Sequence, residues 1–364
     1  MNKVKDLKAR SGDVLLTKSF KKTTISLCMI VKNEAEQLSR CLESVKDLVE
    51  EIIIVDTGST DNTIKIAEAY GAKTFHHPWM DNFSEARNFA LKHATCDWIL
   101  SLDADEELKK EDINLVKEVI KNDGVDGVRC IIHSTSKSTT ALTKSYFPRL
   151  FRNGRGIYYE GTVHERPIIA GKTLASNIRI IHHGYALDKN KMTAKLSAYT
   201  HLLQKQLKAE PDNPTTHFYL AKTYYIQELH ELALREGKEV IKLLPDGIIK
   251  VRPELEIYLI LACTLFETGN PQAAEEMFLK AFELKPNYID PPFFLGKMYF
   301  SMKRYEDSAL YLQKYFQIRK HLETNPDVND LVLHSLMGSD EAQFMLNIIY
   351  KKTKDLCRQQ FHCV

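Results

Sequence analysis

Residues 98–107 have the sequence WILSLDADEE, in which an apolar run ends in a pair of aspartates. The run is apolar without alternation, as expected for a strand that is covered on both faces of a sheet. Asp103 and Asp105 are two positions apart, so in an extended chain their carboxylates point to the same side. Two such carboxylates suit a hard divalent cation that bridges a diphosphate. A solvated helix start before residues 107–116 explains the same acids, so the pair alone does not distinguish the two interpretations.

Short β-rich runs alternate with amphipathic segments on both sides of this stretch, from Ile25 to about His133. The order β, α, β, α predicts a largely parallel sheet with helices on both faces. Looser β-like pieces follow between residues 127 and 183. We expect them to form the far edge of the sheet and the loops that close a site. The fold class predicted for the first half is therefore α/β.

Beyond His183 the sequence is helical in pattern and contains an internal repeat. The positions Leu220, Ala221, Tyr224, Ala233 and Pro245 recur with identical spacing as Leu261, Ala262, Leu265, Ala274 and Pro286. A third copy at Leu295-Gly296 follows the second after about 34 residues, the tetratricopeptide period. The first interval is longer, and we expect its extra residues, 246–252, to bulge from an inter-repeat loop. Helices over 193–208 and 340–357 are expected to start and to cap the stack.

The length of 364 residues predicts two to three domains. We expect a basic extension over residues 1–24, an α/β domain over 25–190 and an all-α repeat domain over 191–364. The extension is either a solvated start or a contact with a membrane or an acidic partner. A net charge of +2 supplies no global field for nucleic acid, so no nucleic-acid partner is expected.

The seven cysteines form no CxxC pair, which favours a reducing compartment and predicts a cytoplasmic location. The sequence contains no run of about 20 apolar residues, so no transmembrane segment is expected. The sequence leaves the oligomeric state open, a homodimer included.

Polar groups also follow the first two predicted strands. Asp56 is suited to accept hydrogen bonds from a nucleobase or ribose, and Gly58 permits close backbone approach. The helix beginning near Thr60 offers free N–H groups to an anion. An ordinary capped turn between strand and helix is the alternative for this segment. Arg87 either neutralises a phosphate or is a surface arginine paired with an acid.

Together these segments resemble the family 2 glycosyltransferases, which bind nucleotide sugars in a GT-A fold. The resemblance covers about Ile25–Leu108, through SLCMIVKNEAEQLSRCLESV, IIIVDTGSTDNT, FSEARNFAL and WILSLDADEEL. It implies a Rossmann-like mixed sheet in which Asp56 meets the uracil of a UDP-sugar. It also implies that Asp103 and Asp105 hold Mn²⁺ or Mg²⁺ and that Arg87 lines the nucleotide pocket. The residues expected to bind the donor are Val31, Asn33, Glu34, Asp56, Gly58, Ser59, Arg87, Asp103 and Ala104.

The segment YEGTVHERP at residues 159–167 looks like the acceptor-side motif of the tetratricopeptide-linked branch of that family. An inverting transferase needs one carboxylate to deprotonate the acceptor nucleophile. Glu165 is the first choice for this base, Glu160 the second, and His164 is a further catalytic candidate. Ile168 stands where HExxH would require its second histidine, so the spacing excludes a zinc protease.

His182 is expected to be a third contact for the metal or the diphosphate, with a core or surface histidine as the alternative. It is adjacent to His183, and neighbours on a strand point to opposite faces, so at most one of them enters the site. Arg149 and Arg152 either pair with the leaving phosphates or are solvated at the edge of a strand.

The same order of domains resembles the sublancin-type enzymes, which glycosylate Cys or Ser in bacteriocin peptides. The predicted function is therefore metal-dependent, inverting transfer of a hexose or N-acetylhexosamine from a UDP-sugar to a Cys or Ser side chain. The acceptor, a peptide or protein, is expected to be held by the repeats. The first alternative is a transferase of surface or envelope glycans. The second is a non-catalytic repeat scaffold.

Overall fold

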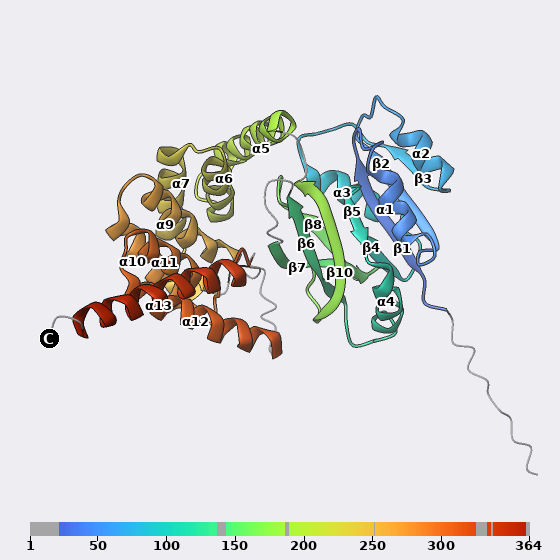
Figure 1. Cartoon of the computed structure of the whole chain (residues 1–364). Helices are drawn as coiled ribbons and strands as arrows, with labels where there is room; N and C mark the ends of the chain where they lie inside the picture. The colour runs from blue at the N-terminus through green and yellow to red at the C-terminus, as the bar shows by residue number, and fades with distance from the viewer. Residues whose placement is uncertain are drawn as a thin grey trace, which may run out of the picture.

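Two halves of different secondary structure lie side by side in the computed structural model (Figure 1). The structure describes residues 22–136, 143–185, 189–250, 252–324, 333–335 and 338–361. We call residues 22–185 the α/β half and residues 189–361 the helical half. The predicted N-terminal extension lies outside the described residues except for 22–24, where Lys22 forms an ion pair with Glu50.

The α/β half is built on an eight-stranded mixed sheet with the order β3-β2-β1-β4-β7-β6-β10-β5. Its strands are β1 (Ile25–Val31), β2 (Glu51–Asp56), β3 (Lys73–His76), β4 (Trp98–Ser101), β5 (Glu106–Leu108), β6 (Gly127–Ser136), β7 (Thr143–Arg152) and β10 (Thr173–Tyr185). The first four strands are parallel, as predicted. The later part is not a simple far edge, because β7 pairs antiparallel with the central strand β4. This arrangement brings side chains from β7 next to the acids that follow β4.

Helices cover both faces of the sheet. Leu27 and Met29 of β1 pack into one core with α1 (Leu38–Val45), α2 (Thr63–Ala69) and α4 (Ile113–Val119). Cys28, between them, packs on the opposite face with α3 (Phe83–Leu91). Strands that are buried on both faces need apolar side chains at successive positions, which explains the unbroken apolar runs in the sequence.

The segment after the paired aspartates forms an edge strand before it becomes helical. Glu106–Leu108 makes β5, which pairs antiparallel with β10 so that His182 lies opposite Glu106. A short 3₁₀ turn and α4 follow it. The predicted helix start is therefore displaced, and the strand between fixes the position of His182 relative to the acids.

The helical half consists of antiparallel helix pairs. Its helices are α5 (Lys189–Ala209), α6 (Pro214–Ile226), α7 (His230–Leu243), α8 (Asp246–Ile249), α9 (Ile257–Glu267), α10 (Pro271–Leu284), α11 (Asp290–Ser301), α12 (Tyr305–Thr324) and α13 (Ser339–Phe361). The three repeat copies are the pairs α6–α7, α9–α10 and α11–α12. In the third pair a Cβ at Gly296 would come within 2.6 Å of the Leu312 side chain, so the small residue permits this close packing. The predicted fold, an α/β sheet followed by helical repeats, is confirmed.

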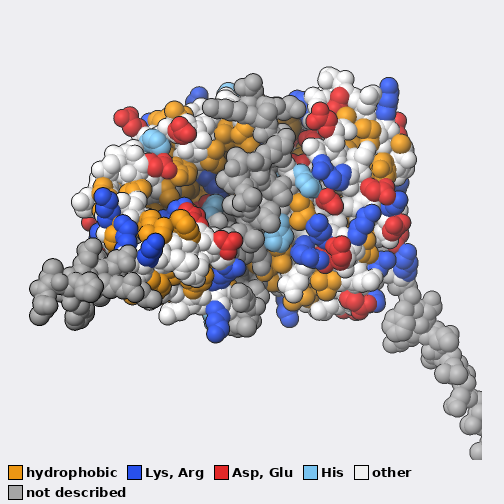
Figure 2. Space-filling view, viewed as in Figure 1, with side chains coloured by type: hydrophobic (Ala, Val, Ile, Leu, Met, Phe, Trp, Pro, Cys, Tyr) orange, Lys and Arg blue, Asp and Glu red, His pale blue; other side chains and the backbone are white. Residues whose placement is uncertain are grey.

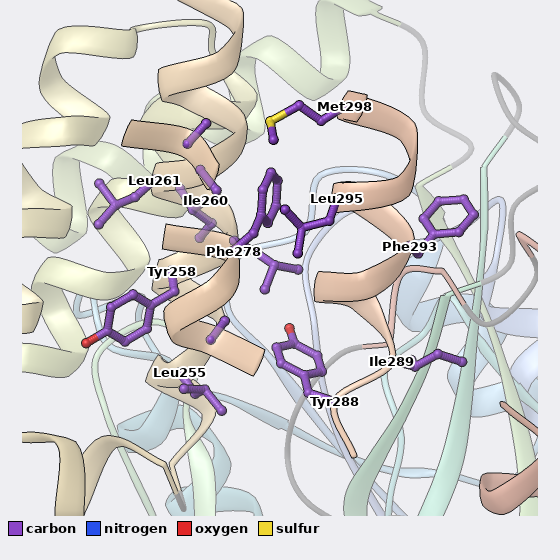
Figure 3. Close-up of a cluster of buried hydrophobic side chains, with 14 of the residues drawn as sticks. Leu255, Tyr258, Ile260, Leu261, Phe278, Tyr288, Ile289, Phe293, Leu295 and Met298 are labelled. Atoms are coloured by element: carbon purple, nitrogen blue, oxygen red, sulfur yellow. The ribbon is translucent and has the colours of Figure 1, made fainter. Parts of the chain in front are cut away.

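The extra residues between the first two repeats do not bulge outward, contrary to the sequence prediction. Of these residues, Asp246–Ile249 form the short helix α8, whose Ile249 is fully buried in the main core of the helical half. The same core contains Phe278, Leu295 and Met298, which Figure 3 shows gathered between the helices. The insertion is therefore an integral part of the stack.

The face of the molecule shown in Figure 2 agrees with the composition. Acidic and basic side chains are interspersed over the face shown in Figure 2, as a net charge of +2 leads one to expect. Within the described ranges, no helix has both the length and the apolar character needed to cross a bilayer.

Candidate active site

A cleft of about 870 Å³ lies between the two halves of the chain. One wall consists of residues that follow β1 and β4 together with the loop at residues 163–165, and the other wall consists of α5 and α6. Nine of the predicted site residues line it: Val31, Glu34, Arg87, Asp103, Ala104, Asp105, His164, Glu165 and His182. The carboxyl end of a parallel sheet is where open α/β folds bind their ligands.

Asp103 lies between two arginines. Its Oδ1 accepts a hydrogen bond from Nη2 of Arg87 at 2.5 Å, and its Oδ2 accepts one from Nη2 of Arg149 at 3.1 Å. Burial opposes ionisation, but the two guanidinium groups hold the pKa of Asp103 well below its usual range. Arg149 also donates to Glu106 at 2.5 Å. Arg149 comes from β7 and is only 8% exposed, so it is not a solvated residue at a strand edge.

Arg87 connects Asp103 to the candidate base. Its Nε donates to Oε1 of Glu165 at 2.5 Å, while its Nη2 holds Asp103. Arg87 is 7% exposed, so it is a buried arginine and not a surface one. Two carboxylates balance its charge in this structure, and its predicted role toward the phosphates of a nucleotide stays a prediction.

Asp105 faces the histidine predicted to share its site. Its Oδ2 lies 3.3 Å from Nε2 of His182, a proximity that follows from the pairing of β5 with β10. Burial would lower the pKa of His182, but the hydrogen bond and the charge of Asp105 raise it. His183, whose Nε2 lies 3.1 Å from Oε2 of Glu107, also lines the cleft. The expectation that at most one of the two histidines enters the site is therefore wrong.

Negative charge gathers on this wall of the cleft. Burial and then the charges of Asp105 and Asp103 raise the pKa of Glu34 to about 7. Carboxylates that repel one another in this way are relieved by a cation, and carboxylate oxygen is the ligand that Mg²⁺ and Mn²⁺ prefer. Within the described part of the chain no three His, Cys, Asp or Glu side chains are already arranged to hold a metal ion. The carboxylates of this wall are therefore chemically suited to bind a divalent cation, although the Asp103 carboxylate is hydrogen-bonded to two arginines in this structure.

The polar groups of the turn after β2 are occupied by local hydrogen bonds. Asp56 accepts from the backbone N–H groups of Gly58 and Ser59 at 3.2 and 3.0 Å, and Oδ1 of Asn33 accepts from Thr60 N–H at 2.8 Å. These contacts are those of the ordinary capped turn that the sequence left as an alternative. Asn33, Asp56, Gly58 and Ser59 do not line the cleft, although Thr57 does. Their assignment to the donor site stays a prediction.

The loop between β8 (Tyr158–Glu160) and β9 (Arg166–Ile168) forms the junction between the two halves. Ser84 of α3 donates to Gly161 O at 2.6 Å, and Phe83 N–H donates to Thr162 O at 3.0 Å. Gly161 has a φ of +105°, and a Cβ there would lie 3.4 Å from Glu165 Cα. Glycine is therefore required where the loop turns to present Glu165.

Consecutive side chains of this loop make different contacts. Val163 is buried in a cluster with α5 and α6, and the His164 ring stacks on Tyr219 of α6 at 3.9 Å between centroids. Desolvation by these groups, then the charges of Lys222 and Lys195, lower the pKa of His164 to about 3, although the residue is exposed. His164 therefore carries no positive charge at neutral pH. Glu160 is exposed and lies outside the cleft lining.

The helical half supplies cleft residues that the sequence did not identify. Lys195 and Tyr199 of α5 and Tyr219 and Lys222 of α6 face the acids across the cleft. Lys222 is paired with Glu256 at 2.8 Å. Lys195 has no ion pair among the described residues, and its Nζ lies 5.8 Å from the centroid of the Tyr199 ring. No motif distinguishes these residues from the apolar and charged positions of an ordinary repeat helix.

The comparisons with known proteins agree with this architecture. Residues 26–182 match the model of glycosyl transferase family 2, and residues 255–288 match that of a tetratricopeptide repeat. The chain is 34% identical over 276 residues to a TPR repeat-containing protein of Synechococcus elongatus, covering 71% of this chain and 66% of that protein. It is 28% identical over 280 residues to the SPbeta prophage-derived glycosyltransferase SunS of Bacillus subtilis, covering 74% and 65%.

Among solved structures, the chain is similar to TarS of S. aureus at 15% identity and a TM-score of 0.40, covering 70% of this chain and 55% of that one. The chain spans about two thirds of the length of the two curated relatives. It thus contains a family 2 glycosyltransferase domain followed by tetratricopeptide repeats.

Proposed function

We propose that this chain transfers a hexose or N-acetylhexosamine from a UDP-sugar to a Cys or Ser side chain of a peptide or protein, with inversion at the sugar. The observation that carries the proposal is the single cleft in which Asp103, Asp105 and Glu165 lie on one wall and the first repeat helices form the other. A donor held by the acids would have its sugar within a space that both halves enclose.

On the donor side, a divalent cation held by Asp103, Asp105 and His182 would supply Lewis-acid stabilisation to the departing diphosphate. The protein adds charge of its own from across the cleft. Lys195 lines the same cleft as Glu34, and its positive charge opposes the rise in the pKa of that carboxyl. An ammonium without a carboxylate partner is suited to the diphosphate oxygens. Its position makes α5 part of the proposed donor site.

On the acceptor side, Glu165 is the proposed general base. The acceptor sulfur or oxygen attacks the anomeric carbon, the bond to the diphosphate breaks, and the acceptor proton passes to the Glu165 carboxylate. Arg87 holds one oxygen of this carboxylate at 2.5 Å and so fixes its direction. A base oriented in advance loses less entropy in the transition state than a mobile one.

The peptide acceptor is supported by the repeats, whose first helices form the wall opposite the acids. Helical repeat stacks offer surfaces on which an extended or helical chain can lie. A transferase of envelope glycans is the alternative acceptor class. A non-catalytic scaffold has no need of acids concentrated at the end of a sheet, and this argues against it.

The proposal is tested by incubating the full chain with a panel of UDP-sugars, Mn²⁺ or Mg²⁺, and Cys- or Ser-containing peptides. We expect a mass increase of one sugar on a peptide, and metal-stimulated release of UDP. Modification of a lipid-linked glycan with no peptide product would favour the envelope alternative. No UDP release with any donor would favour the scaffold.

A further inference from the structure

A second cavity, of about 540 Å³, lies behind the wall of the proposed catalytic cleft. It is enclosed by the β8–β9 hairpin, by α5 and α6, and by the 3₁₀ helix Pro253–Glu256. Val163, His164 and Tyr219 line both spaces, so one stacked pair of rings separates them. A ligand in the second cavity therefore lies next to the loop that presents Glu165.

Arg166 follows Glu165 in the chain but lines this second cavity. Among the residues that the structure describes, its guanidinium has no ion pair or hydrogen-bond partner. Burial raises the pKa of Tyr219, and the charge of Arg166 opposes that rise, which indicates that the guanidinium lies near this wall ring. Glu160 is its register partner across the hairpin, yet no ion pair joins the two.

Two other charged groups of the cavity are engaged, whereas the exposed Glu160 has no ion pair among the described residues. Arg252 donates to Glu254 at 2.7 Å, and Glu210 accepts from Asn213 at 2.6 Å. A half-buried guanidinium without a partner is costly, and it binds a carboxylate through two parallel hydrogen bonds. Among the described residues that line the cavity, Arg166 is thus the guanidinium that has no hydrogen-bond or ion-pair partner.

The first turn of α6 adds to the preference for an anion. Asn213 caps this 13-residue helix, and Thr215 and Thr216 of its first turn line the cavity. The N-terminal end of a helix carries a partial positive charge. Arg166 and this helix end therefore act on the same space.

We propose that the second cavity is an acceptor subsite, in which Arg166 binds an Asp or Glu side chain that lies close in sequence to the glycosylated residue of a polypeptide. This rests on the proposed function. One free guanidinium matches a single carboxylate on an otherwise neutral backbone. A polymer with a phosphate on every unit would add further negative charges in a cavity that Glu160 and Glu210 also line. The amide side chain of Gln206 is available to the peptide backbone.

The test compares pairs of acceptor peptides that differ only by Asp→Asn or Glu→Gln within three residues of the Cys or Ser. We expect the full chain to prefer the acidic member by about tenfold in kcat/KM. Arg166→Ala should abolish this preference and Arg166→Lys should retain part of it, while UDP-sugar hydrolysis without acceptor stays unchanged. Arg155→Ala, an exposed arginine outside both spaces, is the matched control and should keep the preference.

Peptide binding gives an independent readout that does not need turnover. Fluorescence anisotropy with labelled acidic and amide peptides should show about tenfold weaker binding of the amide member to the full chain, and equal binding of both to Arg166→Ala. Equal binding to the unaltered chain, or a preference that survives Arg166→Ala, overturns the subsite. Glycosylation of a polyol-phosphate polymer, with no peptide bound, also overturns it. If the unaltered chain does not hydrolyse any UDP-sugar, the result counts against the proposed function and not against the subsite.

Discussion

The Nε atom of Arg87 lies 2.5 Å from Oε1 of Glu165, and the other edge of the same guanidinium holds Asp103. One buried cation therefore joins the carboxylate proposed as the base to the carboxylate that follows the central strand. Each acid stabilises the arginine that orients the other. Substitution of either acid is expected to change the position of its counterpart as well as its own chemistry.

Glu165→Gln keeps an oxygen for Arg87 but removes the ability to accept a proton. We expect kcat for sugar transfer to fall by about 10²–10⁴-fold with little change in donor affinity. Glu160→Gln should lower kcat far less, because Glu160 does not line the cleft. Steady-state kinetics of both variants decide between the two candidates. A larger loss in Glu160→Gln would reverse their roles.

Asp105→Asn tests the metal without disturbing the arginines that hold Asp103. The variant should fold normally, since among the described residues the Asp105 carboxylate forms an ion pair only with His182. We expect metal-stimulated release of UDP to fall at least about 10²-fold. Asp123→Asn, at a fully exposed carboxylate, serves as the control. An unchanged metal titration curve in Asp105→Asn would exclude Asp105 as a ligand.

Lys195→Met tests whether the helical half contributes to the donor site. Loss of an ammonium that faces the diphosphate should raise the Kd for UDP by about five- to tenfold and leave the fold intact. Lys208→Met changes an exposed lysine near the end of the same helix and should leave the Kd unchanged. Isothermal titration with UDP measures both. Equal affinity in the two variants would confine the donor site to the α/β half.

Gly161→Ala places a Cβ where the backbone φ is +105° and Glu165 Cα is 3.4 Å away. The strain should cost about 1–3 kcal/mol and displace the loop that carries Glu165. Activity should fall along with the thermal unfolding midpoint. Gly247→Ala, in the short helix α8 with no atom within 4 Å of the added Cβ, should be neutral or slightly stabilising. A neutral Gly161→Ala would contradict the required conformation.

Glu256 makes the stability of the helical half depend on pH. Burial opposes its ionisation, but Lys222 and His334 lower the pKa of Glu256 from 4.5 to about 2. Because the folded value lies below the unfolded one, this stabilisation is present above about pH 4.5 and is lost as the pH falls towards 2. It corresponds to about 3 kcal/mol at neutral pH.

Glu256→Gln should therefore reduce the free energy of unfolding at pH 7 and do so much less at pH 3. Urea unfolding followed by far-ultraviolet circular dichroism measures the effect. Trp98 is buried in the core of the α/β half, so its fluorescence provides an internal control for that half once Trp79, which packs against α5 and α6, is replaced by Phe. The exposed Glu276→Gln is the matched variant. An equal loss at both pH values would show that packing and not charge is responsible.

The fold could be predicted from the sequence because its signals are local. Unbroken apolar runs indicate doubly covered strands, and small residues at fixed spacing indicate paired repeat helices. The insertion of β7 beside β4 could not be predicted, because strand order depends on contacts between residues about 50 apart. The packing of Ile249 could not be predicted for a related reason. The sequence of the insertion at residues 246–252 does not indicate whether it packs into the core or bulges outward.

The candidate site was predictable on one wall only. Motif residues such as Asp103, Asp105 and Glu165 occur in recognisable patterns, and the structure brings them to one cleft. Lys195 and Tyr219 belong to repeat helices whose sequence pattern reports packing, so their function depends on how the halves meet. The pairing of Arg87 with two acids is equally invisible in sequence, because each partner is distant along the chain.

Val163 has a practical consequence for protein engineering. Its side chain belongs to the α/β half by sequence but is 5% exposed within the cluster formed by the first helices of the repeats. A chimera that joins a foreign repeat array after residue 188 would remove the apolar side chains that pack around Val163. The loop that carries Glu165 would then lose this packing. To transfer the proposed acceptor preference between related chains, residues 158–168 must therefore be exchanged together with the repeats.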